Sequence, residues 1–312
     1  MSDTLIQCEN LTKLYGLVLG VNDVSLSLPR GVHGLLGPNG AGKSTFLKLI
    51  TGQLQPTGGT IQVLGEPPWN NAALFHRVGV CPEQDAFYDF MTGAQFVETL
   101  CSLNGYPREE ARARARKSLE RVSMSDRADR KINTYSKGMR QRTKLAQALA
   151  HDPEFLILDE PLSGLDPQGR YDMVQIIRQL GREGKSIIIS SHILHEVETM
   201  TDDFLLITSG RVLAAGNVHE IRDLMDDYPH RITVRSDRIK ELARELIAEM
   251  PLAGLELDTE RNALTLLTHR PGDFYQKFPS LVVSGKFVVS EITSQDDNLD
   301  AVFKYLLEAG KS

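Results

Sequence analysis

The sequence predicts an α/β protein with a mixed sheet at its core and a helical subdomain, followed by a small α+β domain. Three observations support this fold class. A glycine-rich loop, residues 37–44, separates a short apolar run from a helical pattern. Two later apolar runs, in PEFLILDEP and KSIIISSHILHE, have the length and composition of buried parallel strands. After residue 229 the pattern changes to short strands that alternate with amphipathic helices.

The composition is that of a soluble chain with two domains. It has 312 residues, of which 41% are hydrophobic and 24% charged, and the net charge of −6 gives no support to nucleic-acid binding. Cys8, Cys81 and Cys101 are widely spread, so we expect reduced, mostly buried thiols and neither a disulfide nor a zinc site. The first residues lack the plan of a signal peptide, and no apolar run approaches the ~18 residues of a membrane span. We therefore expect a cytoplasmic protein.

The glycine-rich loop has the pattern of a phosphate-binding site. In VHGLLGPNGAGKSTFLKLITG, a strand at Val32–Leu36 leads into G-x-x-x-x-G-K-[ST], and the helix that follows ends at Gly52. Backbone N–H groups of such a loop and the positive end of the helix dipole bind phosphate. Lys43 is expected to reach the β- and γ-phosphates and Ser44 to hold Mg²⁺. The predicted nucleotide-binding residues here are Gly37, Pro38, Asn39, Gly40, Ala41, Gly42, Lys43, Ser44 and Thr45.

Acidic residues and a histidine follow the two later strands. Asp159 is placed to support Mg²⁺, which leaves Glu160 to orient or deprotonate a water for attack on the γ-phosphate. An acidic pair that only caps a turn is the alternative, but the phosphate-binding loop favours catalysis. His192 follows the next strand, where active-site residues of parallel sheets collect, and is a candidate γ-phosphate sensor.

Taken together, residues 4–222 resemble the nucleotide-binding subunit of ATP-binding cassette (ABC) transporters. GPNGAGKST is similar to the Walker A loop of this family, FLILDEP to its Walker B strand, SGLDP with Asp166 to its D-loop, and SSH to its H-loop switch. The resemblance implies an ATPase that binds ATP and Mg²⁺. It also matches Tyr15 with the aromatic residue that stacks on adenine, although an isolated tyrosine is by default a packing residue.

The segment YSKGMRQR, residues 135–142, occupies the place of the family's LSGGQ signature. The resemblance implies that Ser136 and Gly138 bind the γ-phosphate of ATP held by the opposite subunit, while Ser136 can also cap its own helix. One phosphate-binding loop and one signature stand in the sequence. Each complete site is therefore expected to need two cassettes, as in a homodimer.

Two positions depart from the family pattern. Lys137 stands where glycine is usual, and we expect its side chain to point away from the phosphate. In GVCPEQDAFYDFMT, Glu83 follows the proline where the lid glutamine of the family normally lies, and Gln84 comes one residue later. Adjacent side chains of an extended segment point opposite ways, so they cannot substitute trivially. We favour Gln84 as the metal-binding lid residue and keep Glu83 open, because its oxygens could also bind Mg²⁺.

The remainder of the chain suggests partners and a second domain. The first domain is expected to span residues 1–225, with a helical subdomain at about 85–150, where AFYDFMTGAQF is a candidate docking surface for a membrane partner. DDYPH, residues 226–230, is read as the boundary. Residues 229–312 then follow a β-α-β-β-α-β order, with a short helix around residues 272–278 and the last strand in KFVVSEI, residues 286–292, which suggests a ferredoxin-like accessory domain. They end in a further helix, LDAVFKYLLEAG.

These expectations combine into one functional hypothesis. The chain is expected to hydrolyse ATP for a separate multi-span permease, for export, and to be peripheral on the cytoplasmic face of the membrane through that permease. The alternative is a soluble cassette protein that acts on a non-membrane target such as the ribosome or DNA. A nucleotide-dependent switch without sustained turnover is disfavoured because Glu160 and His192 are both present.

Overall fold

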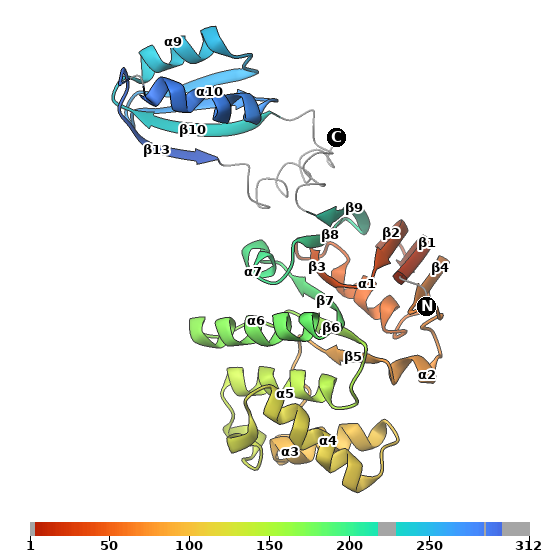
Figure 1. The fold of residues 1–312 in the computed structure, drawn as a ribbon. Helices are drawn as coiled ribbons and strands as arrows, with labels where there is room; N and C mark the ends of the chain where they lie inside the picture. The colour runs from red at the N-terminus through yellow and green to blue at the C-terminus, as the bar shows by residue number, and fades with distance from the viewer. Residues whose placement is uncertain (1–3, 218–228, 284, 295–312) are drawn as a thin grey trace. The chain divides into compact units, whose positions relative to one another are not determined.

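The computed structural model describes residues 4–217, 229–283 and 285–294. The chain divides into two compact units, Met1–Gly216 and Asn217–Ser312, each with its own hydrophobic core. Most of the predicted boundary segment, residues 226–228, lies outside the described residues, as does the predicted final helix at 299–310. Figure 1 draws the elements of both units.

An antiparallel sheet begins the first unit. Its order is β2-β1-β4, formed by β1 (Thr4–Tyr15), β2 (Val18–Pro29) and β4 (Gly58–Val63). β1 buries Leu5, Ile6 and Leu11 completely, while the hairpin tip between β1 and β2 is exposed. The sheet is therefore buried at the start of β1 and open to water at the hairpin tip.

The second sheet of this unit holds the strands that the apolar runs predict. Its order is β5-β6-β7-β3-β8-β9. Its strands are β3 (Val32–Leu36), β5 (Val78–Cys81), β6 (Phe155–Asp159), β7 (Ser186–Ser191), β8 (Asp203–Thr208) and β9 (Arg211–Asn217). β5, β6, β7, β3 and β8 pair in parallel, with Asp159 beside Ser190 and Leu36 beside Ser191. The carboxyl ends of β3, β6 and β7 consequently meet at one edge.

Both faces of this sheet are covered, which explains why its strands are apolar along their whole length. In the first unit, α1 (Lys43–Ile50), α2 (Ala72–Phe75), α6 (Pro167–Arg182) and α7 (Leu194–Glu198) lie outside the helical subdomain that is expected from the sequence. Along β6, Phe155 and Ile157 share a core cluster with Phe46 of α1, whereas Leu156 and Leu158 belong to the cluster of α6 and α5 (Lys137–Leu149).

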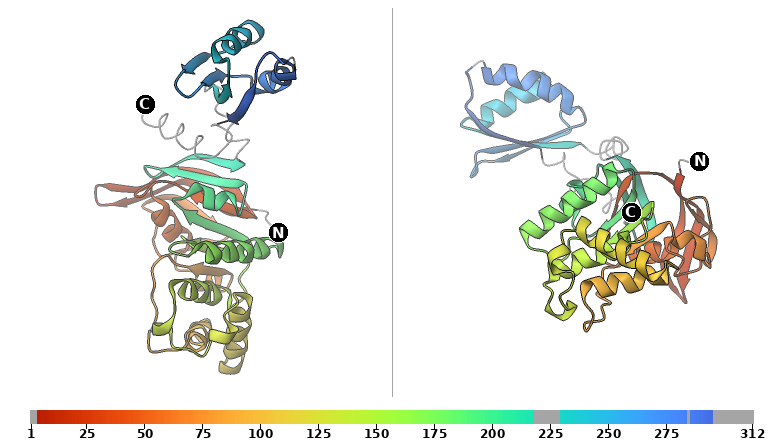
Figure 2. Two further views of the ribbon diagram at one scale, coloured as in Figure 1. Left: turned by 90° about the vertical axis from the view of Figure 1, so that its left-hand side faces the viewer. Right: turned by 60° about the horizontal axis from the view of Figure 1, so that its bottom comes forward.

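A helical group lies between β5 and β6 in the sequence. It consists of α3 (Gly93–Leu103), α4 (Arg108–Arg121), α5 (Lys137–Leu149) and the 3₁₀ turns Ser125–Arg127 and Ile132–Thr134. α3, α4 and α5 pack on one another, and Figures 1 and 2 show them gathered beyond α6. None of the helices in the described part of the chain combines the length and apolarity that a membrane span requires. Cys8, Cys81 and Cys101 are buried and free, and burial raises the pKa of Cys8 and of Cys81 to about 12.

The second unit has the β-α-β-β-α-β order that the sequence predicts. Its elements are β10 (His230–Ser236), α9 (Ile239–Glu249), β11 (Gly254–Asp258), β12 (Ala263–Thr268), α10 (Pro271–Val283) and β13 (Val289–Ser294). The sheet is antiparallel in the order β11-β12-β10-β13, so the first and third strands are central, as in a ferredoxin-like fold. Both helices cover the face that carries Ile232, Val234, Leu264 and Leu266.

Two boundaries in the second unit differ from the sequence expectation. The helix expected at 272–278 continues to Val283 with Pro279 inside it, because Phe274, Phe278 and Leu281 all face the core at helical spacing. The last strand begins at Val289, not at Lys286. Tertiary packing of the apolar side chains overrides the local preference of proline here.

We predict that Phe274→Ala destabilises the second unit by about 3–5 kcal/mol, because Phe274 is fully buried and stacks on Phe278. Thermal unfolding followed by calorimetry measures the change. Val283→Ala removes carbon from a side chain that is 86% exposed and is the matched control. An equal loss of stability in both variants would contradict the described core.

Candidate functional site

The phosphate-binding loop connects β3 to α1 in a conformation that glycine alone can supply at two positions. A Cβ at Gly37 would lie 2.2 Å from the carbonyl oxygen of Ile207, and one at Gly42 would lie 2.4 Å from that of Gly20. Gly42 also has a φ of 108°. No side chain caps the first turn of α1, so its N–H groups are open to an anion.

Lys43 spans this loop from the start of α1. Its Nζ donates to the carbonyl oxygens of Gly37 at 2.6 Å and Pro38 at 3.2 Å. Burial lowers the pKa of Lys43, and the negative charges of Glu160, Asp159 and Glu83 act in the opposite direction. The ammonium group is therefore surrounded by the acidic residues that the sequence predicts for catalysis and metal binding.

The acidic pair lies at the end of β6, where β7 orients it. The hydroxyl of Ser190 donates to Asp159 Oδ1. The backbone N–H of Glu160 lies 3.1 Å from the Ser190 carbonyl oxygen and 3.3 Å from its Oγ. Glu160 itself has a φ of 48°, in the left-handed region that most side chains avoid. Ser190, which is fully buried, thus holds both acidic residues.

Glu160 and His192 form the central contact of the site. His192 Nδ1 lies 2.8 Å from Glu160 Oε1, and the two residues come from neighbouring parallel strands. The Glu160 side chain is only 11% exposed, whereas that of His192 is 47% exposed. Because His192 contacts both solvent and the shielded carboxylate of Glu160, it can position this carboxylate and also contact a ligand that binds from solvent.

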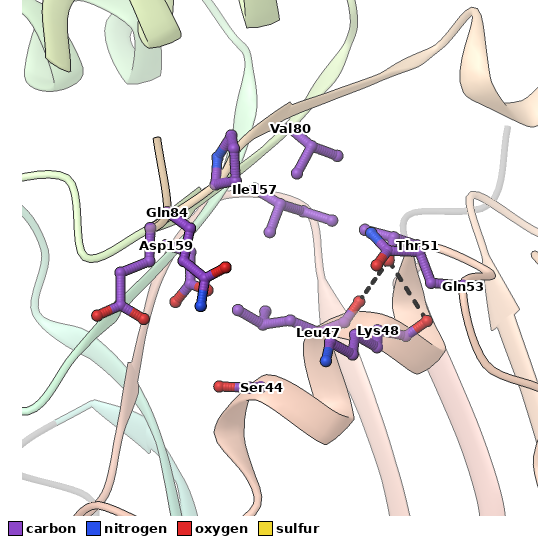
Figure 3. A pocket seen from close by; sticks show the side chains of 11 residues that line it. Ser44, Leu47, Lys48, Thr51, Gln53, Val80, Gln84, Ile157 and Asp159 are labelled. Atoms are coloured by element: carbon purple, nitrogen blue, oxygen red, sulfur yellow. Dashed lines mark hydrogen bonds between the residues drawn. The ribbon is translucent and has the colours of Figure 1, made fainter. Parts of the chain in front are cut away.

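The four residues predicted to bind metal line one cavity of about 280 Å³. Ser44 comes from α1, Asp159 from β6, and Glu83 and Gln84 from the lid segment, residues 82–89, which follows β5. In Figure 3, Gln84 and Asp159 lie on one side of the cavity and Ser44 on another. The lining offers carboxylate, hydroxyl and amide oxygens, the ligand types that Mg²⁺ prefers.

Tyr15 lies beside the start of α1. A Cβ at Gly20 would lie 2.7 Å from the edge of the Tyr15 ring, so the ring rests on this glycine. Its hydroxyl is 3.5 Å from Thr45 Oγ1, and the residue is 44% exposed. The structure therefore brings Tyr15 close to the phosphate-binding loop and leaves part of its ring open to a ligand.

The YSKGMRQR segment forms the start of α5. Ser136 caps the helix, accepting a bond from the Met139 N–H at 3.3 Å, and Gly138 follows in the first turn. Tyr135 is buried and its hydroxyl donates to the Arg127 carbonyl at 2.7 Å. Asp166 likewise caps α6 through the Gly169 N–H at 3.0 Å. These hydrogen bonds are formed with residues nearby in the sequence. The side chains of Ser136 and Asp166 remain exposed.

Lys137 folds over the loop that precedes Asp166. A Cβ at Gly164, where φ is 67°, would lie 1.9 Å from Lys137 Nζ. The lysine side chain therefore occupies the space beside Gly164 in its own chain. The sequence motif does not predict that the Lys137 side chain lies beside Gly164.

Comparison with known proteins places the chain among transporter subunits. Residues 21–163 match the family described as ABC transporter. An uncharacterized ABC transporter ATP-binding protein of Nostoc is 41% identical over 72% of this chain and 70% of its own length. The daunorubicin resistance ATP-binding protein DrrA3 of Streptomyces coeruleorubidus is 34% identical over 85% and 84%. A Nod factor export ATP-binding protein of Burkholderia orbicola is 40% identical over 71% and 73%.

Solved structures agree with this placement. A structure titled as the ATP binding subunit of an ABC transporter superposes with a TM-score of 0.64 and 28% identity, covering 71% of this chain and 93% of that chain. A dimeric ATP-binding cassette bound to ADP and phosphate superposes with a TM-score of 0.63 and shares the fold at 23% identity, over 69% and 99%.

Sequence reasoning overlooked Ser190, and it provides a test of the site. We predict that Ser190→Ala lowers ATP turnover about 10- to 100-fold, because Asp159 loses its donor and residues that orient ligands act at this scale. Ser191→Ala is the control, since the Ser191 hydroxyl accepts a bond from the Ile193 N–H at 3.0 Å, whereas the Ser190 hydroxyl donates to the carboxylate of Asp159. Turnover measured against Mg²⁺ concentration distinguishes them, and identical curves for both variants would contradict the assignment.

Proposed function

The chain belongs to the family of ABC transporter ATP-binding proteins, and we propose that this ATPase subunit drives export through a separate membrane permease. The observation that carries the proposal is the contact of Glu160 with His192 at the edge where the phosphate-binding loop begins. ATP hydrolysis requires a group that orients or deprotonates water close to the γ-phosphate. The carboxylate of Glu160 has that chemistry, and His192 would hold it in position.

The nucleotide would lie on the loop from Gly37 to Thr45. Its phosphates would accept from the N–H groups at the start of α1 and from Lys43, which exchanges its present carbonyl partners for phosphate oxygens. Tyr15 would stack on the adenine, because its ring is partly exposed beside Thr45. These roles follow from the open N–H donors of the loop and the partial exposure of the Tyr15 ring.

Ser44 and Asp159 would hold Mg²⁺, whose chemistry when bound is to neutralise charge on the phosphates. The oxygen-rich lining of the cavity fits this ion. Glu83 and Gln84 both line the cavity and are both candidates for the lid residue.

A dimer would complete each site. Ser136 and Gly138 are exposed or partly exposed at the start of α5, and Asp166 is exposed at the start of α6. We propose that these residues contact the nucleotide on the loop of a second copy. ATP would then close the two copies and hydrolysis would release them, which is a cycle able to do mechanical work.

The proposal of export is supported by the relatives. One is named for daunorubicin resistance and another for Nod factor export. Transport requires membrane-spanning helices, so the permease would be a separate protein and the chain would be peripheral to the cytoplasmic face. Tyr88 and Phe90 are 54% and 71% exposed in the lid segment and its continuation, and they would contribute to the surface that meets the permease.

We predict that Glu160→Gln lowers ATP turnover by about 10²–10⁴-fold, because the amide cannot accept a proton from water. ATP binding should persist, since the loop and Lys43 are unchanged. Steady-state ATPase assays and equilibrium binding of a fluorescent ATP analogue measure the two effects. Glu154→Gln is a control, because Glu154 contacts Arg30 and Arg77 and lies at the opposite end of β6. Unchanged turnover in Glu160→Gln would overturn the catalytic assignment.

We predict that Ser136→Arg abolishes cooperative hydrolysis while it leaves binding of a nucleotide analogue to the loop nearly intact. The reason is that the bulky cation would occupy the surface offered to the second copy, not the loop of its own chain. The Hill coefficient of turnover and the binding isotherm are the measurements. If binding and turnover were lost together, the segment would serve only the fold of its own chain.

A further inference from the structure

One face of α5 carries three polar side chains at positions i, i+4 and i+7: Arg140, Lys144 and Gln147. Residues at this spacing lie in a row along a helix. Each of them bonds to the stretch of chain from β5 through the lid segment, residues 80–89. None of the three is among the residues proposed above to bind nucleotide or metal.

Lys144 makes the most buried of these contacts. Its side chain is only 5% exposed, and its Nζ lies 3.1 Å from Asp85 Oδ1 and donates to the carbonyl oxygen of Glu83 at 2.7 Å. A buried ammonium group needs such partners in place of water. Lys144 therefore holds the Glu83 carbonyl on one side of Gln84 and the Asp85 carboxylate on the other.

Arg140 and Gln147 extend the contact in both directions. Arg140 Nη2 lies 3.1 Å from Asp89 Oδ1, and its guanidinium group stands 5.6 Å from the centre of the Phe87 ring. At the other end, Gln147 Nε2 donates to the Val80 carbonyl oxygen at 2.6 Å. The lid segment is thus bound to α5 along its length.

We propose that Lys144, supported by Arg140, is a positioning residue that makes the lid segment and α5 move together. Ser136 and Gly138 lie at the start of α5, and the lid segment contributes Glu83 and Gln84 to the cavity that Ser44 and Asp159 also line. The contact therefore links the nucleotide site of one chain to the surface that this chain offers to its partner. The inference rests on the proposed function, because it assumes that this surface completes the second site.

Lys185 provides a matched control within the same chain. Its Nζ lies 2.8 Å from Asp152 Oδ1 and donates to the Pro153 carbonyl at 2.6 Å, and its side chain is 12% exposed. The bonding pattern is that of Lys144, a carboxylate and a backbone carbonyl. It stands before the amino end of β7, whereas the nucleotide site is at the carboxyl end of that strand. Loss of its charge should affect stability without affecting the lid.

The experiment uses the full chain with Glu160→Gln, so that hydrolysis does not deplete ATP. In this background, Lys144→Met should raise the ATP concentration required for dimerisation about tenfold or more, a typical size for coupling between sites. Sedimentation velocity measures dimerisation. A fluorescent ATP analogue measures the affinity of the monomeric chain for nucleotide, and this affinity should not change. Hydrogen exchange of residues 82–89 should become faster. Lys185→Met should leave dimerisation and this exchange as in the parent.

A second variant protects the test against misfolding. The Asp85 side chain is 41% exposed, so Asp85→Asn should fold, and it should accelerate exchange of residues 82–89 as Lys144→Met does. The double variant should be no more impaired than Lys144→Met, because both changes remove the same contact. Unchanged exchange in Lys144→Met would overturn the inference, and so would equal effects of Lys144→Met and Lys185→Met. Failure of the parent to dimerise with ATP would instead contradict the proposed function. Hydrogen exchange in the ATP-free chain tests the Lys144 contact independently of dimerisation, so the two failures can be distinguished.

Discussion

The parallel pairing of β3, β6 and β7 is the constraint on which the site depends. It brings the phosphate-binding loop, the acidic pair and His192 to one edge, although the loop lies more than a hundred residues before the acidic pair in the sequence. Because side chains alternate along a strand, a slip of one residue in β6 would exchange the faces of Asp159 and its neighbours. The apolar side chains of β6, held by cores on both faces, make that slip costly. The chemistry of the site is therefore secured by the packing of the sheet.

α5 connects two features that lie in separate segments of the sequence, the YSKGMRQR segment and the lid segment. Its first turn presents Ser136 and Gly138, and its later turns hold the lid segment through Lys144. A helix transmits displacement along its axis with little bending, so the two ends cannot respond independently. Lys137 adds a contact between this helix and the loop at Gly164. The elements that face a second copy are therefore connected within each chain.

Structural features that depend on neighbouring residues can be predicted from the sequence, whereas features that depend on distant residues cannot. The strand Val32–Leu36, the helix after it and the cap at Ser136 depend on neighbouring residues, so the sequence pattern identifies them. Ser190 and Lys144 act through residues 31 and 59 positions away, and a motif pattern contains no information on those pairs. α10 continues past Pro279 because of buried side chains, which is again a tertiary cause. The choice between Glu83 and Gln84 depends on the direction of two adjacent side chains, which spacing does not specify.

The backbone of Glu160 has a consequence for how this chain could evolve. A left-handed conformation disfavours a glutamate by about 1–2 kcal/mol relative to glycine, which adopts it freely. A lineage released from the need to turn over ATP would gain resistance to heat by losing this side chain, whereas an active lineage must tolerate the strain. The residue at position 160 is therefore a point at which stability and catalysis place opposite demands on the chain.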